Sequence, residues 1–217
     1  MKALLLPLVA ALLALPLPAE PTREVRVDFS NPGLYPSQWT LTVHPDGRGH
    51  FHAEGGSKPT DENSAMIPGK VDRDVSLSGN FVNRIFQTVR QPRLMSGQCE
   101  SHLKVAFQGW KKITYIGPDG QGGCEFNYSK NKEIQDLGDS LVAVGSTLIE
   151  GARLELLLQY DPLGLDSAIR YMLEASDDGR LQQICSIREI LERVEDDPRV
   201  MYRVRMRTRI LLARANK

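Results

Sequence analysis

The sequence is poor in the residues that most often carry out catalysis. Among its 217 residues are only three cysteines and four histidines. Neither G-x-S-x-G, typical of serine hydrolases, nor H-E-x-x-H, typical of zinc proteases, occurs in it. The closest cysteine and histidine, Cys99 and His102, would lie on opposite faces of an extended strand and could not act together. We therefore predict no catalytic residue, and a non-enzymatic protein is favoured over an enzyme.

Charge of one sign is not in excess either, since 27 Lys and Arg residues balance 27 Asp and Glu residues. A balanced chain has no general attraction for nucleic acids or anionic membranes, so we expect no nucleic-acid partner. The one local bias is a stripe of arginines in the last predicted helix, at Arg199, Arg203, Arg207 and Arg214. Ion pairs with the acidic residues in 189–197 would account for this stripe, and an anionic lipid or envelope polymer is the alternative partner.

Long hydrophobic runs are absent from the sequence apart from one near its start. Lys2 precedes an almost wholly apolar segment, Ala3 to Leu17, which is followed by Pro18-Ala19 and then by polar sequence. This pattern is typical of a secretory signal peptide. The segment is shorter than the roughly 20 apolar residues of a membrane-spanning helix, and a retained membrane anchor is the alternative. We predict a signal peptide over residues 1–19 and a periplasmic or secreted protein with no transmembrane segment after its removal.

Residues 99–128 hold two of the three cysteines and the clearest alternation of apolar and polar residues. The alternation predicts a meander of three strands, near 99–107, 111–116 and 124–128. Cys99 and Cys124 would then lie on the core side near one end of the middle strand. We predict a disulfide between them, because an exported chain meets an oxidising compartment. Closing a loop of about 25 residues in this way would stabilise the fold by about 3–4 kcal/mol.

A tight turn at Pro45-Asp46-Gly47 joins two predicted strands of the N-terminal half. The turn sets a register that pairs Thr42 with His50 and Thr40 with His52. One face of this hairpin is predicted to be buried. Its inward side chains are Trp39, Leu41, Val43, Phe51 and Ala53.

The opposite face of this hairpin carries three histidines, which form the strongest candidate site. Neutral imidazoles bind Zn²⁺ or Cu²⁺, and His44, His50 and His52 would lie near one another on adjacent strands. The pattern places no carboxylate or thiolate among them, and a flat surface leaves a bound ion open to water. We therefore expect no resident cofactor and only weak, pH-dependent binding of Zn²⁺. A metal-binding protein or metal-dependent hydrolase is the alternative interpretation of the same residues.

The rest of the sequence is mainly helical in pattern. One helix is expected after Ser78, and a long one between Ser129 and Pro162, in which glycines indicate close packing or a bend. Three shorter helices are expected to start near Asp166, Leu181 and Asp197. Cys185 lies in the second of them and is expected to be a buried free thiol.

In chain order these elements are three strands and a helix, three strands and a helix, and three further helices. We predict an α+β fold in which two βββα units share one antiparallel sheet, with the helices on one face. The sheet domain would span residues 24–160. Residues 161–217 would form a C-terminal helical segment packed on it.

Three segments share features with a known group of sequences. They are F-Q-G-W-K-K-I-T-Y-I-G-P-D-G-Q-G-G-C-E-F-N-Y-S-K, L-V-A-V-G-S-T-L-I-E-G-A-R-L-E and Q-I-C-S-I-R-E-I-L-E-R-V. Over roughly residues 99–212 the chain resembles an uncharacterised family of exported bacterial proteins. The resemblance implies export and carries no known activity or cofactor. We therefore expect an exported, non-enzymatic protein that binds a protein or an envelope component.

Overall fold

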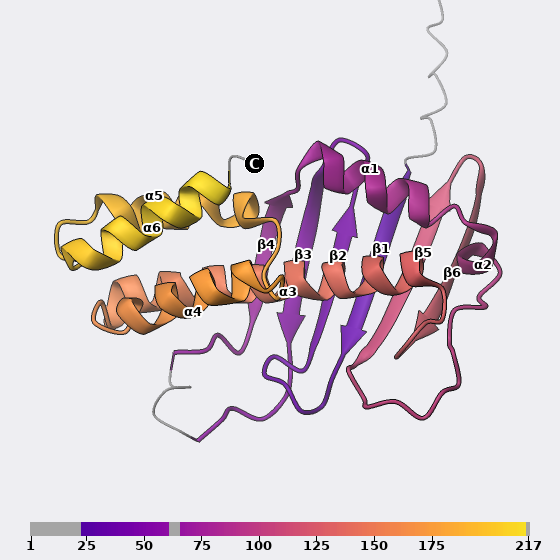
Figure 1. Ribbon diagram of the computed structural model, residues 1–217, viewed down its shortest axis with the longest axis horizontal. Coiled ribbons are helices and arrows are strands. Elements are labelled where there is room, and N and C mark those ends of the chain that lie inside the picture. The colour runs from indigo at the N-terminus through magenta and orange to yellow at the C-terminus, as the bar shows by residue number, and fades with distance from the viewer. Residues whose placement is uncertain (1–22, 61–65, 216–217) are drawn as a thin grey trace, which may run out of the picture.

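The computed structural model describes residues 23–60 and 66–215 and has the predicted α+β architecture (Figure 1). Its strands form one antiparallel sheet in the order β4-β3-β2-β1-β5-β6. The strands are β1 (Glu24–Ser30), β2 (Gln38–Val43), β3 (Arg48–Glu54), β4 (Val71–Ser76), β5 (Trp110–Gly117) and β6 (Gly120–Phe126). β1 lies inside the sheet between β2 and β5, so the two halves of the chain meet there. The predicted signal peptide over residues 1–19 lies outside the described residues.

The first hairpin has the predicted register. Thr42 pairs with His50 and Thr40 pairs with His52. Gly47 takes a φ of +84°, a left-handed conformation that suits glycine in this turn. The side chains predicted to face inward are all buried: Trp39, Leu41, Val43, Phe51 and Ala53.

Over residues 23–60 and 66–215, the six strands are divided between the two halves of the chain as four and two, not as the predicted three and three. The unexpected strand is β4, which pairs with β3 at the edge of the sheet. Its sequence resembles a strand only weakly, because Arg73 stands between the inward-facing Val71 and Val75. The guanidinium of Arg73 lies 3.5 Å from the carboxylate of Glu155 on the long helix, which compensates for an inward-facing charge.

The predicted strand over 99–107 is wrong. Cys99 and Ser101 are buried, but residues 102–108 are exposed and form a loop. Two features turn the chain away from the sheet. His102 has a left-handed φ of +54°, and the Glu100 carboxylate accepts the backbone N–H of Asn127 (2.7 Å), next to the end of β6. Alternation alone therefore did not make a strand here. The Glu100 side chain, and not the backbone of a paired strand, accepts the N–H of Asn127.

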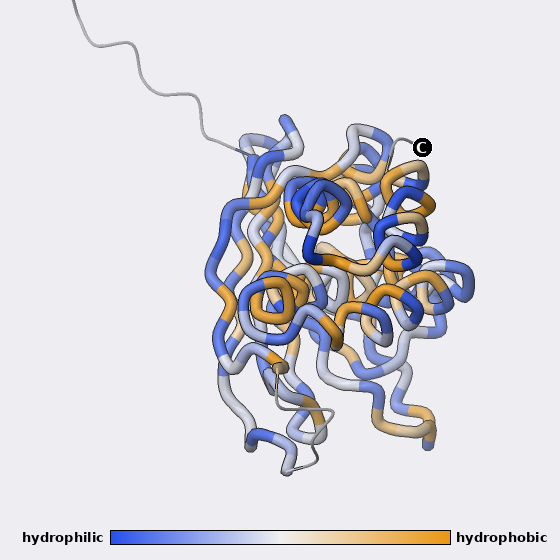
Figure 2. The backbone as a smooth tube through the Cα atoms, turned by 90° about the vertical axis from the view of Figure 1, so that its left-hand side faces the viewer, coloured by the Kyte–Doolittle hydropathy of each residue, from blue (hydrophilic) through white to orange (hydrophobic). Residues whose placement is uncertain are grey.

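Helices cover one face of the sheet, as predicted (Figure 2). The covering helices are α1 (Gly79–Thr88) and the long α3 (Lys132–Tyr160), and the short α2 (Pro92–Met95) lies beside β6. The Asn131 side chain starts α3 by accepting the backbone N–H groups of Glu133 and Ile134. Gly145 marks a close approach, because a Cβ there would lie 2.8 Å from the Trp39 ring.

α3 extends beyond the sheet, and the remaining helices pack around that extension (Figure 1). They are α4 (Leu165–Asp177), a 3₁₀ turn (Ile184–Ile187), α5 (Arg188–Asp196) and α6 (Tyr202–Arg214). The hydrophobic core runs without interruption from the sheet into these helices and includes both Leu41 and Val204. The division into residues 24–160 and 161–217 stays a prediction.

Two expectations for the C-terminal segment are corrected. The last helix starts at Tyr202 instead of Asp197, because Asp197 holds a turn in which it accepts the backbone N–H of Arg199 (2.8 Å). Cys185 is half-exposed, not buried. It lies in the 3₁₀ turn, where its thiol contacts the side-chain oxygen of Gln183 at 3.6 Å.

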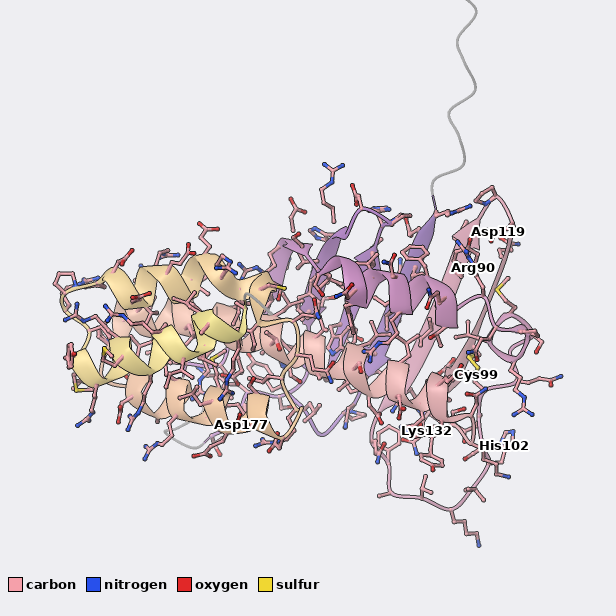
Figure 3. The ribbon with its side chains drawn as sticks, turned by 45° about the horizontal axis from the view of Figure 1, so that its top comes forward. Arg90, Cys99, His102, Asp119, Lys132 and Asp177 are labelled. Carbon is pink, nitrogen blue, oxygen red and sulfur yellow. A yellow bond between two sulfur atoms is a disulfide. The ribbon has the colours of Figure 1, made fainter. Side chains whose placement is uncertain are left out.

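The predicted disulfide is present, with Cys99 and Cys124 joined across a Cα–Cα distance of 5.9 Å (Figure 3). Cys124 lies on the inner face of β6, opposite Ile113 of β5. Cys99 reaches it from the segment that follows α2 and not from a strand. The bridge therefore ties the start of the 102–108 loop to the sheet.

Candidate ligand-binding face

One face of the sheet has no helix over it among the described residues (Figure 2). We call it the outer face. The strand registers arrange its side chains in rows that cross the sheet. One complete row contains Asp72, His52, Thr40, Asp28, Lys112 and Glu125. A second row contains Asp74, His50, Thr42, Arg26 and Thr114.

Two of the three predicted histidines lie together at the β4 end of these rows. Both ring nitrogens of His50 contact carboxylates, Nδ1 with Asp74 at 3.0 Å and Nε2 with Asp72 at 3.1 Å. His52 is held in the same way, by Asp72 at 2.9 Å and by Glu54 at 3.2 Å. The expectation that no carboxylate lies among the histidines is therefore wrong, because β4, a strand that we did not predict, brings Asp72 and Asp74 beside them.

The contact between His52 and Asp72 shifts the pKa of both side chains. The hydrogen bonds of His52 with Asp72 and Glu54 raise the pKa of His52 above its ordinary value of 6.5. The hydrogen bond from His52 lowers the pKa of Asp72 below its ordinary value of 3.8. Both shifts favour the charged state of this contact, a His52 imidazolium beside the Asp72 carboxylate, in which the ring nitrogens donate hydrogen bonds and do not ligate metals.

The third predicted ligand, His44, shares a groove with His50 that does not include His52. It follows the end of β2, and Arg48 also lines this wide groove at the hairpin end of the sheet. His102 is remote, in the exposed loop beside the disulfide (Figure 3). Within residues 23–60 and 66–215, no three His, Cys, Asp or Glu side chains converge in a way that could hold a metal ion.

The middle of the outer face is ordered by hydrogen bonds. The Asp28 carboxylate accepts a bond from the Thr40 hydroxyl at 2.8 Å and pairs with the Arg26 guanidinium at 2.9 Å. Burial acts to raise the pKa of Asp28, but these two donors outweigh it, so the pKa is lowered. Asp28 is therefore a carboxylate at neutral pH and a fixed acceptor on the surface.

A hollow of about 310 Å³ lies on the outer face beside this carboxylate. Trp110, at the start of β5 and 42% exposed, lines one side of it. The Phe107 ring packs edge-to-face against Trp110, with 6.3 Å between ring centroids. The polar side chains of the hollow are Asp28, Ser30, Gln38, Thr40, His52, Glu54, Lys112 and Glu125. The hollow therefore offers a ligand one exposed aromatic surface and several polar groups.

Sequence reasoning missed the carboxylates of β4 and the role of Trp110. The V-D-R-D-V segment at 71–75 has the alternation of a short strand, and it would have placed Asp72 and Asp74 on one face. The parity of the predicted strand 111–116 would likewise have placed Trp110 beside Lys112. Neither signal shows which face is uncovered.

The arginine stripe of the last helix is paired. Arg203 and Arg207 contact Asp166 of α4, at 3.2 and 2.6 Å, and Arg214 contacts Asp177 at 2.8 Å. Only Arg199 of the stripe pairs within the acidic run before it, with Asp197 at 2.6 Å. The pairs with Asp166 and Asp177 join α6 to α4, and together these ion pairs leave less charge for an anionic partner.

No family model matches this chain, and no curated protein matches it. Among the described helices, none is long and apolar enough to cross a membrane. The resemblance of residues 99–212 to exported bacterial proteins stays a prediction.

Proposed function

We propose that the protein is an exported, non-enzymatic binding protein that presents its outer face to a protein or another component of the cell envelope. The observation that carries the proposal is the uncovered face itself, on which charged and polar side chains are held in rows by cross-strand contacts. Fixed donors and acceptors recognise a partner with little loss of side-chain entropy. A face that served only to keep the sheet in solution would not need the hollow beside Trp110.

Export is supported by the signal pattern of residues 1–19 and by the disulfide, which is stable in oxidising compartments. The protein recovered from its host should begin near Glu20. N-terminal sequencing tests this, and an intact Met1 on a cytosolic protein would contradict it.

Site-specific crosslinking tests the binding face. A photo-reactive amino acid is placed at Thr42 or Thr114, both in the middle of the outer face, and intact cells are irradiated. The control carries it at Glu174, an exposed position of α4. We expect discrete adducts from the two outer-face positions and none from the control. Equal labelling at all three positions would contradict the proposal.

A second candidate is a metal-binding protein or metal-dependent hydrolase, favoured by the carboxylates that β4 brings to His50 and His52. Calorimetric titration with Zn²⁺ at pH 7.5 separates the two candidates. We expect weak binding, because Zn²⁺ must displace the proton that His52 shares with Asp72. Submicromolar binding that disappears in a His50→Ala, His52→Ala double variant would put the metal candidate first.

A further inference from the structure

We propose that the hollow beside Trp110 is a saccharide-binding subsite, whose ligand is an uncharged or cationic glycan. This inference rests on the proposed function and names the chemical class of its ligand. The argument starts from the shape of a pyranose ring, which has an apolar face of C–H groups and an edge of hydroxyls. A matching site needs an exposed aromatic face and, around it, planar polar groups that both donate and accept hydrogen bonds.

Trp110 supplies the aromatic face. It is the first residue of β5 and points away from the core, with 42% of its surface exposed. Its ring is held in place by the edge of Phe107, and the loop that carries Phe107 is itself fixed. Asn127 anchors this loop by accepting the backbone N–H of Gln108 (2.7 Å) and donating to the carbonyl of Ala106 (3.2 Å). The platform is therefore positioned before any ligand arrives.

The polar groups follow Trp110 across neighbouring strands. Trp110 pairs with Ser30 of β1, which pairs with Gln38 of β2. The next row brings Lys112 and Glu125 to the same hollow. The side chains of Ser30, Gln38 and Glu125 line the hollow, where their donors and acceptors can reach the hydroxyls of a ligand. Asp28 adds an acceptor whose direction Thr40 and Arg26 already fix.

The charges of the hollow select among saccharides. Asp28, Glu54 and Glu125 contribute three carboxylates to the hollow, opposed by Lys112 and by the Arg26 guanidinium that pairs with Asp28. An acidic polysaccharide or a nucleic acid would meet net repulsion. A lipid surface fits poorly too, because most residues that line this hollow are polar and, of its Phe and Trp residues, Phe29 and Trp39 are buried and Trp110 is exposed. A neutral or amino-sugar glycan meets neither obstacle.

The volume of the hollow is consistent with a short stretch of one glycan chain. About 310 Å³ is at the lower end of the pockets that bind small molecules, roughly 300–1,000 Å³. One stacked ring with a few hydrogen bonds implies weak binding, on the order of millimolar for a single site. Repetition of the sugar along an insoluble polymer would strengthen retention at the envelope.

The test is an NMR titration of the mature protein with cellotetraose, maltotetraose and tetra-N-acetylchitotetraose, with polygalacturonate as the acidic probe. We expect at least one neutral tetrasaccharide to shift the Trp110 indole and the Gln38 and Lys112 amides. Trp110→Ala should weaken binding about tenfold, and Trp110→Tyr should restore part of it. The control is Tyr202→Ala, which removes an even more exposed aromatic, on α6, and should leave saccharide binding unchanged.

The outcomes separate this inference from the proposed function. Shifts that persist in Trp110→Ala, or equal binding of polygalacturonate, overturn the saccharide assignment. No shift with any neutral tetrasaccharide, while Thr42 and Thr114 still crosslink to an envelope protein, overturns it too and leaves the binding face in place. Gln38→Ala is the second variant, because its exposed side chain can be removed without disturbing the Phe107 and Trp110 contact.

Discussion

The two faces of the sheet come from the same strands and have opposite chemistry. On β2, Leu41 has no exposed surface and lies in the core, whereas its neighbour Thr42 points outward. The inner side chains pack against α1 and α3 and contribute stability through burial of apolar surface. The outer side chains contact one another and solvent. The difference separates the two tasks of the sheet, since burial on one face maintains the fold and leaves the other face to serve binding.

Substitutions on adjacent residues of β2 give the sharpest test of this division. Leu41→Ala should lower the free energy of unfolding by about 2–5 kcal/mol, because it leaves a cavity under the helices. Thr42→Ala should change it by less than about 1 kcal/mol, within the range of strand preferences at exposed positions. Urea denaturation followed by circular dichroism measures both. A similar loss of unfolding free energy in the two variants would show that both faces contribute equally to stability.

The disulfide fastens a surface loop to the covered face, and its removal should have the next largest effect. A Cys99→Ala, Cys124→Ala variant should lose about 3 kcal/mol, since its unfolded state regains the freedom of the closed loop. Cys185→Ala is the control and should cost under about 1 kcal/mol, because the thiol is half-exposed. Non-reducing peptide mapping should find Cys99 linked to Cys124. A link to Cys185 would contradict this structure.

Close packing on the covered face can be probed with two glycines. In Gly145→Ala the new methyl group would lie 2.8 Å from the Trp39 ring, so we expect a loss of about 1–3 kcal/mol. Gly79, at the start of α1, has no atom within 4 Å of an added Cβ. Gly79→Ala should therefore raise stability by up to about 1 kcal/mol through helix propensity. Thermal unfolding of both variants measures the contrast, and a stabilised Gly145→Ala would argue against the tight contact.

The smallest effect concerns protonation on the outer face. Because its pKa is raised above 6.5, His52 contributes stability that is fully present below pH 6.5 and is lost as the pH rises through the folded value. Asp72 has a lowered pKa, so its contribution is present above 3.8 and is lost as the pH falls through the folded value. The pair therefore stabilises most between about pH 4 and 6.5.

NMR titration of the His52 ring checks this directly. We expect a pKa above 6.5 in the unmodified protein and a value closer to 6.5 in Asp72→Asn. Asp46→Asn is the control, because Asp46 pairs with Arg48 and not with His52. An unchanged His52 pKa in Asp72→Asn would show that the contact is not maintained in solution.

Local patterns predicted much of this fold correctly. The turn at 45–47 and the alternation around it determined both the register of β2 with β3 and the inward set that includes Leu41 and Phe51. α3 followed from its apolar stripe and its end before Pro162. The same reasoning failed over 99–107. Leu103 and Phe107 alternate there as in a strand, but this segment pairs with none of the described strands. Alternation indicates that a segment prefers an extended conformation, but pairing with a distant segment decides whether it forms a strand.

The sequence by itself determined the features that depend on neighbours along the chain: the hairpin register, the inward faces of its strands and the length of α3. It also predicted the pairing of Cys99 with Cys124, although by way of a strand that does not form. Only the tertiary structure decided which face stays uncovered, that Asp72 meets His52, and that Trp110 lies beside Ser30 and Gln38. Those contacts join segments far apart in the sequence. They form through strand order and helix packing, which the periodicity of apolar residues along the sequence does not encode.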